Sequence, residues 1–378
     1  MTGHKKEIRP GVWRLRVSMG LDPVTGKYRY TSKTVVGGPR IADKALAELS
    51  AGISTAKSSV TLGRLLEEYI STNRGLALKT RQSYDYLASH HIVPALGKKK
   101  IEALTGRDLD NFYKSLADKG LSAKTINHMH SLIRVALNQA IKWGWIEKNV
   151  ATLATPPTVR ASVASAPSPH ELGLILTEAA KHNQHLAAML TLSALTGARR
   201  GEALAIRHSD YDPKERTLTI SRSIGYTVKD GTYEKSTKTN GRRKIGLDDT
   251  LESVILSQMQ ALTDDAKYGG FEIVQDPFLF YAEPDGSKPF HPDSPSKFFR
   301  KICDSLGMDY HLHQLRHFTA TQLIAAGVDV RTVSGRLGHA DASITLRIYS
   351  HVLEAQDRAA SEYLGSIVSP QKTPELKE

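Results

Sequence analysis

The chain has 378 residues and carries 51 Lys and Arg against 39 Asp and Glu, a net charge of +12 at pH 7. This length predicts two or three domains, because one hydrophobic core rarely organises more than about 250–300 residues. The excess of positive charge favours polyanionic partners, although charge alone says little about the fold.

The compartment is predicted from what the sequence lacks. The single cysteine, Cys303, excludes a disulfide within the chain and fits a reducing cytosol. The sequence has no run of about 18 apolar residues, and its start, MTGHKKEIRPG, lacks the apolar core of a signal peptide. We therefore expect a soluble intracellular protein with no membrane partner.

Residues 1–58 are the most basic part of the chain, with 11 Lys and Arg against 4 Asp and Glu. Apolar residues alternate at Trp13, Leu15 and Val17, and the turn DPVTG precedes a second run, KYRYTSKTVV. This pattern predicts a small antiparallel sheet of three strands, followed by a short helix that ends at Gly52. Its basic residues could enter a DNA groove or could only keep the sheet in solution. They are Arg14, Arg16, Lys27 and Arg29.

Residues 59–150 have the apolar spacing of helices. The run TLGRLLEEYI places its apolar side chains on one stripe behind a cap at Thr61, and a long final helix starts at Ser122 and stops at Gly144. Four helices with short loops predict a compact domain, which could clamp DNA or be a simple bundle. The basic residues on its polar positions are Lys79, Arg81, Lys124 and Arg134.

Residues 151–168 are rich in Pro, Ala and Ser, and this composition predicts an extended linker at the main domain boundary. A domain over 169–365 follows, in which helices surround a β-rich insertion at about 215–247. The tail 366–378 has too few apolar residues to pack. The fold class predicted from these patterns is multidomain and mainly α, with small β-sheets.

Two motifs in the last domain are weak when taken singly. In LTGARRGEALAIRHSD, Arg199 and Glu202 stand three residues apart after a Thr-Gly break, which by itself favours an ion pair on a helix surface. In STKTNGRRKIGL, Lys238 lies in a turn between two strands, where a lysine is usually exposed to solvent.

Two further motifs lie near the carboxy terminus. HLHQLRH places His313, Arg316 and His317 at positions i, i+3 and i+4, so their polar groups share one helix face. In VSGRLGHADASITLRIYSHV, His339 follows a Leu-Gly that should end a helix, and Tyr349 stands ten residues later. A tyrosine at an apolar helix position is usually a core residue.

Together, these motifs occur in an order and spacing that chance does not explain, and the chain resembles the tyrosine recombinases of the phage integrase type. The resemblance is strong over 167–365. More loosely, 59–150 resembles the helical domain that binds the core site, and 1–58 resembles the domain that binds arm sites. It implies an amino-terminal three-stranded sheet plus helix, a helical core-binding domain and an α+β catalytic domain.

The resemblance also implies roles for the matching residues. Tyr349 matches the nucleophile that forms a 3′-phosphotyrosine and releases a 5′-hydroxyl. Arg199 and Arg316 match the arginines that hold the scissile phosphate. Lys238 matches the lysine that protonates the leaving 5′-oxygen, and His313 matches the first histidine.

Three supporting positions match as well. His339 stands where the family has His or Trp, Glu202 matches an acidic position near the first arginine, and His317 matches a histidine behind the reacting groups. Gly246, where the family often has Pro, is a mild departure at a strand end.

The chemistry of these residue types agrees with the implied roles. Two guanidinium groups suit the dianionic centre of a phosphodiester under attack, and they stay charged at any working pH. A tyrosine, with an ordinary pKa near 10, needs a base or positive potential to react at neutral pH. The phosphotyrosine retains the energy of the broken bond, so we expect no ATP, metal or other cofactor.

Three alternatives stay open from the residues alone. His313 and His317 have the spacing of zinc-binding histidines in a metal hydrolase, but Gln314 replaces the glutamate of that motif and Arg316 would lie beside the cation. A DNA-binding protein without catalysis is the second alternative. A relaxase like the type IB topoisomerases is the third, and only analogy favours recombination over it.

The partners implied by the resemblance are double-stranded DNA, at core and arm attachment sites, and three further copies of the chain in a tetramer. A DNA-bending host factor and a directionality factor are further possible partners in integration or excision of a phage or mobile element. Residues 351–368 have apolar side chains at helical spacing, which could dock on a neighbouring protomer or pack on their own domain.

Overall fold

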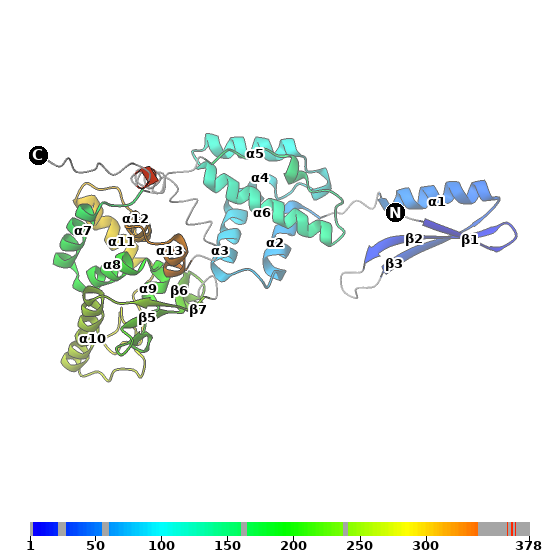
Figure 1. Ribbon diagram of the computed structural model, residues 1–378. Coiled ribbons are helices and arrows are strands. Elements are labelled where there is room, and N and C mark those ends of the chain that lie inside the picture. The colour runs from blue at the N-terminus through cyan, green and yellow to red at the C-terminus, as the bar shows by residue number, and fades with distance from the viewer. Residues whose placement is uncertain are drawn as a thin grey trace, which may run out of the picture. The chain divides into compact units, whose positions relative to one another are not determined.

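The computed structural model describes residues 3–21, 28–54, 60–159, 165–236 and 241–338, with 361, 364, 365 and 367 near the carboxy terminus (Figure 1). The chain divides into two compact units, residues 1–161 and 162–378. Helices predominate and the sheets are small and antiparallel, which confirms the predicted fold class. None of the described helices is both long and apolar enough to traverse a bilayer.

The first unit begins with a three-stranded antiparallel sheet in the order β1-β2-β3, with α1 on one face (Figure 1). Leu15 and Val17 point to that face and are fully buried, as is Ala42 of the helix. The predicted helix end at Gly52 is wrong by two residues, because one glycine in a last turn costs only about 1 kcal/mol. The elements are β1 (Gly3–Arg9), β2 (Val12–Leu21), β3 (Tyr28–Val36) and α1 (Pro39–Ser54).

The helical part of the first unit follows the predicted pattern. The hydroxyls of Thr61 and Ser122 accept backbone hydrogen bonds at the starts of α2 and α6, which confirms both predicted caps. The helices share one hydrophobic core, which includes Leu62 of α2 and Leu132 of α6. A short 3-10 turn, Val150–Leu153, adds Ala151 to this core, so the packed helical part continues into the segment predicted as a linker. The helices are α2 (Leu62–Thr72), α3 (Leu78–Leu87), a π-helical turn (Ala88–Ile92), α4 (Val93–Leu96), α5 (Gly106–Asp118) and α6 (Ala123–Lys142).

The second unit is built around α8, which is apolar on all sides and packs against α7, α9, α10, α11 and α12. Cys303 of α11 is fully buried in the core that α11 shares with α7, α8 and α12, and burial raises the pKa of its thiol to about 11. The helices are α7 (Pro169–His182), α8 (Gln184–Thr196), α9 (Arg200–Leu204), α10 (Asp249–Gly269), α11 (Ser294–Ser305), α12 (Gln314–Ala325) and α13 (Val330–Leu337).

The predicted β-rich insertion is confirmed and contains two small sheets. One has the order β4-β5-β8, and its Leu218 and Ile245 are buried beside Ile255 of α10. The other is the hairpin of β6 and β7. The strands are β4 (Tyr211–Asp212), β5 (Thr217–Ile220), β6 (Arg222–Thr227), β7 (Gly231–Ser236) and β8 (Arg243–Gly246).

Candidate active site

The predicted catalytic residues fall into two groups. The structure brings Arg199 and Arg316 to the same site beside His313, each bonded to the turn that ends a neighbouring helix. Lys238, His339 and Tyr349 lie outside the described residues, in the segments that follow β7 and α13.

Arg316 is anchored to the end of α8. The residue is only 4% exposed, and its Nη1 donates a 2.7 Å hydrogen bond to the carbonyl oxygen of Gly197. Gly197 has a φ of +67°, and a β-carbon there would lie 2.4 Å from Leu337 Cδ2. Glycine is therefore required in the turn that presents this carbonyl to the guanidinium. One turn along α12, the Thr319 hydroxyl donates to the carbonyl oxygen of Ala194, also at 2.7 Å, and fixes the same two helices.

Arg199 immediately precedes α9 and is held by two acceptors. Its Nη1 donates to Glu202 Oε1 at 2.7 Å, and its Nη2 donates to the carbonyl oxygen of Gly338 at 3.1 Å. Glu202 is 2% exposed and also accepts from the Arg199 backbone at 3.0 Å. Arg199 and Glu202 do form an ion pair, but it is not the surface pair that their spacing alone predicts, because the Glu202 carboxylate is buried.

Arg243, the first residue of β8, is part of this arrangement and was missed by the sequence reasoning. Its Nη2 donates to Glu202 Oε2 at 2.6 Å and its Nε to the carbonyl oxygen of Arg336 at 2.8 Å. Burial alone would raise the pKa of Glu202, but Arg243 and then Arg199 outweigh it, so the net pKa lies below the usual value. The Arg-x-x-x-Leu pattern after Lys238, which begins at Arg243, is the signal that could have identified it.

His313 and His317 lie against each other at the start of α12. Their ring centroids are 5.2 Å apart and the rings are nearly perpendicular, at 83°. Desolvation, with His317, Arg316 and Arg199 nearby, lowers the pKa of His313 to about 4, although the residue as a whole is exposed. Burial, and then the charge of Arg316, also lower the pKa of His317. At pH 7 His313 is therefore neutral and has a nitrogen lone pair available to accept a proton.

A cavity of about 220 Å³ opens beside these residues. His313 and Arg316 line it, together with Arg200, whose Nη1 donates to Ser296 Oγ at 2.8 Å and to Asp293 Oδ1 at 3.2 Å. Within the described ranges, no group of three His, Cys, Asp or Glu side chains is placed to hold a metal ion. The side chains around His313 carry positive charge, which suits an anion better than a divalent cation.

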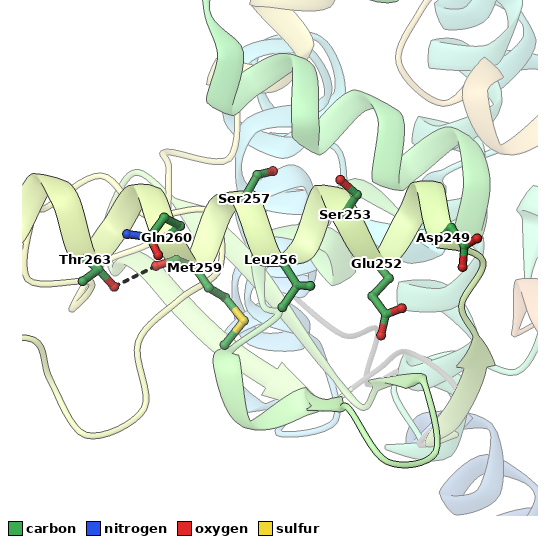
Figure 2. Close-up of a pocket in the computed structure, with 8 residues that line it drawn as sticks. All are labelled: Asp249, Glu252, Ser253, Leu256, Ser257, Met259, Gln260 and Thr263. Carbon is green, nitrogen blue, oxygen red and sulfur yellow. Dashed lines mark hydrogen bonds between the residues drawn. The ribbon is translucent and has the colours of Figure 1, made fainter.

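A second hollow, of about 670 Å³, runs along α10, and Figure 2 shows the side chains that line it. Leu256 and Met259 point to one side of the helix, and Ser253 and Ser257 to the other. Its two carboxylates, Asp249 and Glu252, each accept from Arg216 Nη2 at 2.6 Å. Among the described residues, those that line the hollow all belong to α10, and none of them is a predicted catalytic residue.

The amino-terminal sheet presents basic and aromatic side chains on the face opposite α1. Arg14 and Arg16 are exposed on β2, where they alternate with the buried Leu15. The Arg16 guanidinium lies 3.9 Å from the ring centroid of Tyr30, which is 49% exposed. The remaining two predicted contacts are not placed: Lys27 and the side chain of Arg29 lie outside the described part.

The four basic residues predicted to contact DNA in the helical unit differ in their surroundings. Lys124 and Arg134 are exposed on α6, and Lys79 is exposed on α3, where it donates to Gln82 at 3.1 Å. Arg81 is different, because its guanidinium donates to the carbonyl oxygens of Ser71 and Asn73 at 3.3 and 2.9 Å. It thereby satisfies acceptors at the end of α2.

Comparison with known proteins shows which family the chain belongs to. Residues 168–356, half of the chain, match the phage integrase family, and residues 61–117 match the N-terminal SAM-like domain of phage integrases. The chain is therefore a tyrosine recombinase, an enzyme of DNA integration that cleaves and rejoins DNA strands. Within that class it belongs to the phage integrase family, as the motifs of its sequence indicated.

Similar proteins cover nearly the whole chain. It is 26% identical to a tyrosine recombinase XerC-like protein of Caldanaerobacter subterraneus, over 94% of this chain and 96% of that protein. It is 24% identical to the ICEBs1 integrase of Bacillus subtilis, over 96% of this chain and 99% of that protein.

A solved structure shares the fold. The Tn1549 transposon integrase in complex with a circular intermediate DNA has a TM-score of 0.70 at 21% identity, over 81% of this chain and all of that one. A lambda integrase dimer bound to a COC′ core site has a TM-score of 0.59 at 19% identity, over 91% and 93% of the two chains.

Proposed function

We propose that this integrase cuts a DNA strand by attack of Tyr349 on the scissile phosphate. The tyrosine oxygen forms a bond to phosphorus as the bond to the 5′-oxygen breaks, which leaves a 3′-phosphotyrosine and a free 5′-hydroxyl. The observation that carries the proposal is the paired arrangement of Arg199 and Arg316. Each guanidinium is fixed by a backbone carbonyl, of Gly338 and Gly197 respectively, beside a neutral His313.

The two arginines are suited to bind the reacting phosphate. A phosphodiester gains negative charge on its equatorial oxygens as a nucleophile adds, and guanidinium groups donate two hydrogen bonds each while remaining charged. Because Arg199 and Arg316 are held by the fold before DNA binds, little reorganisation is needed at the moment of reaction. This preorganisation stabilises the transition state more than the bound substrate.

The proton transfers are assigned to the remaining residues. Neutral His313 accepts the phenolic proton as Tyr349 attacks, and Lys238 donates a proton to the departing 5′-oxygen. His339 contributes a further hydrogen bond to the phosphate. Rejoining is the reverse attack by a 5′-hydroxyl on the phosphotyrosine, so the bond energy is retained and neither ATP nor a metal is consumed.

We further propose how the domains share the DNA. Residues 1–58 bind arm sites, 59–150 bind the core site, 151–168 connect them to the catalytic domain at 169–365, and 366–378 form a tail. The exposed Arg14, Arg16 and Tyr30 support the first of these roles. A protomer that holds two sites raises the effective concentration of each for the other.

Strand exchange between two duplexes takes four cleavages, which a tetramer on DNA supplies. A lambda integrase tetramer bound to a Holliday junction has the same fold, with a TM-score of 0.60. Residues 351–368 dock on a neighbouring protomer in this proposal, and host bending and directionality factors bias integration or excision. The substrate places the reaction in the bacterial cytoplasm, at the nucleoid.

The first experiment is covalent trapping. The protein is incubated without metal or ATP with a nicked suicide duplex made from DNA that flanks its gene, beside Tyr349→Phe and a matched control, Tyr268→Phe. Tyr268 is 98% exposed on α10, away from the site, so its variant should behave as wild type. A protein–DNA band on denaturing gels that only Tyr349→Phe loses supports the proposal.

Other outcomes of the same experiment would contradict parts of it. A covalent band that persists in Tyr349→Phe removes the assigned nucleophile. Tight binding with no band from any variant favours a regulatory DNA-binding protein. Relaxation of a supercoiled plasmid that carries no attachment site favours a type IB topoisomerase-like relaxase.

A further inference from the structure

Arg199, the first of the two phosphate-binding arginines, belongs to a ring of hydrogen bonds that the backbone of residues 336–338 closes. Arg199 donates to two acceptors, Glu202 Oε1 and the carbonyl oxygen of Gly338. Arg243 donates to the other oxygen of the same carboxylate and to the carbonyl oxygen of Arg336, two residues before Gly338. The Arg243 guanidinium therefore holds both groups that accept from Arg199: the Glu202 carboxylate directly, and the Gly338 carbonyl through the backbone of Arg336 two residues earlier.

The surroundings make this ring stiff. The side chain of Arg243 is 9% exposed and Glu202 is 2% exposed, so water competes little for these donors and acceptors. Gly338 ends α13 with a φ of +68°, and a β-carbon there would lie 2.8 Å from Arg243 Nη1. The close approach of the guanidinium to this backbone depends on the absence of a side chain at that position. Arg336 Nη2 in turn donates to the carbonyl oxygen of Leu195 in α8, at 3.1 Å.

We propose that Arg243 is a positioning residue, which sets the location of the Arg199 guanidinium through Glu202 and through the end of α13. It joins three segments that carry or adjoin reactive positions: β8, which follows Lys238 in the sequence, α9 with Glu202, and the α13 turn before His339. The inference rests on the proposed role of Arg199 at the scissile phosphate. Arg243 itself donates its bonds to protein groups and need not contact DNA.

The physical consequence of losing Arg243 follows from the charges. The Glu202 carboxylate binds the guanidiniums of Arg199 and Arg243 at the same time. A shift of Arg199 away from Glu202 therefore also disturbs the bond between Glu202 and Arg243. Without Arg243, Glu202 keeps its hydrogen bonds from Arg199 but loses the donor that holds Oε2 from β8, and the α13 turn loses its tie to β8. A displacement of about 1 Å at a group that must meet a transition state costs about 100-fold in rate.

The experiment compares Arg243→Met and Arg243→Lys with Arg242→Met, each in the full chain. Arg242 is the exposed neighbour in sequence, so its variant removes the same charge without breaking the ring. We measure the single-turnover rate of covalent complex formation on the suicide duplex, the equilibrium affinity for that duplex, and amide hydrogen exchange over residues 330–338.

The expected result has three parts. Arg243→Met slows covalent complex formation about 100-fold, while the affinity for DNA stays close to that of Arg242→Met. Amides of α13 exchange faster in Arg243→Met only. Arg243→Lys, which keeps the charge beside Glu202 but not the planar fork, gives an intermediate rate.

A double variant tests the route through Glu202. If Arg243 acts through this carboxylate, the double variant Glu202→Gln, Arg243→Met is no slower than the worse single variant. If the wild-type chain forms no covalent complex, the proposed function fails, and hydrogen exchange still decides on Arg243. A rate and an exchange pattern of Arg243→Met equal to those of Arg242→Met would overturn the inference.

Discussion

Arg316 in α12 donates a 2.7 Å hydrogen bond to the carbonyl oxygen of Gly197, the residue that ends α8 119 positions earlier. The left-handed backbone of Gly197 turns this carbonyl toward the guanidinium. The φ angle of Gly197 therefore helps to set the position of the Arg316 guanidinium. The relationship gives a direct way to disturb Arg316, the proposed phosphate-binding side chain, without changing it.

Gly197→Ala should destabilise the protein and slow cleavage, whereas Gly270→Ala should cost only the strain of a left-handed alanine, about 1–2 kcal/mol. Both glycines end helices with φ values of +67° and +71°, but only at Gly197 would a β-carbon collide, at 2.4 Å from Leu337. Chemical denaturation and single-turnover cleavage measure the two effects. Equal losses of stability in the two variants would contradict the steric part of the explanation.

Arg199→Lys and Arg316→Lys should each lower the cleavage rate by about 10²–10³-fold and leave DNA affinity nearly unchanged. Lysine keeps the charge, but it cannot donate to a backbone carbonyl and to a phosphate in one plane. Arg216→Lys is the control, because Arg216 binds carboxylates of α10 away from the site. Loss of DNA affinity without a change in rate would show that these arginines only hold the duplex.

His313 should titrate near 4 in the free protein, as measured by the NMR shift of its imidazole, and not near 6.5. Its folded pKa lies below the unfolded value, so the unfolded chain binds the proton first and stability falls as the pH drops from about 6.5 toward 4. His313→Gln should lose this part of the pH dependence. Binding of DNA should raise the pKa, because a phosphate favours the imidazolium.

Arg16→Ala should reduce by about 1 the slope of log affinity against log salt for duplex DNA that carries an arm site. Lys5→Ala should leave the slope unchanged, because Lys5 pairs with Asp43 of α1 and lies 5.4 Å from the Trp13 ring centroid. Fluorescence anisotropy across a salt series provides both slopes. Identical slopes for Arg16→Ala and wild type would remove Arg16 from the DNA interface.

Deletion of residues 352–378 should leave binding of single sites intact and abolish tetramer assembly on DNA. The reason is the proposed docking of this segment on a neighbouring protomer. Analytical ultracentrifugation of the protein with paired sites measures the assembly. A tetramer of the shortened chain would mean that the segment packs on its own domain.

The sequence predicted best those features that are set locally. Thr61 and Ser122 cap helices because a hydroxyl needs only a free backbone amide two or three residues on. The burial of Glu202 could not be predicted in this way, since it depends on Arg243, 41 positions away. Arg243 was missed for the same reason: a charged residue in a short strand is ordinarily exposed, and only tertiary contacts bury it.

The burial of Cys303 allows site-specific labelling of the chain, because the native thiol does not compete with an introduced one. It is the single cysteine of the sequence, it is fully buried, and its thiol has a pKa of about 11, so at neutral pH it presents almost no reactive thiolate. A cysteine substituted at an exposed position, such as Tyr268, would therefore accept a maleimide dye at one defined place. Pairs of differently labelled protomers could then report assembly on DNA by energy transfer, without removal of any native residue from the core.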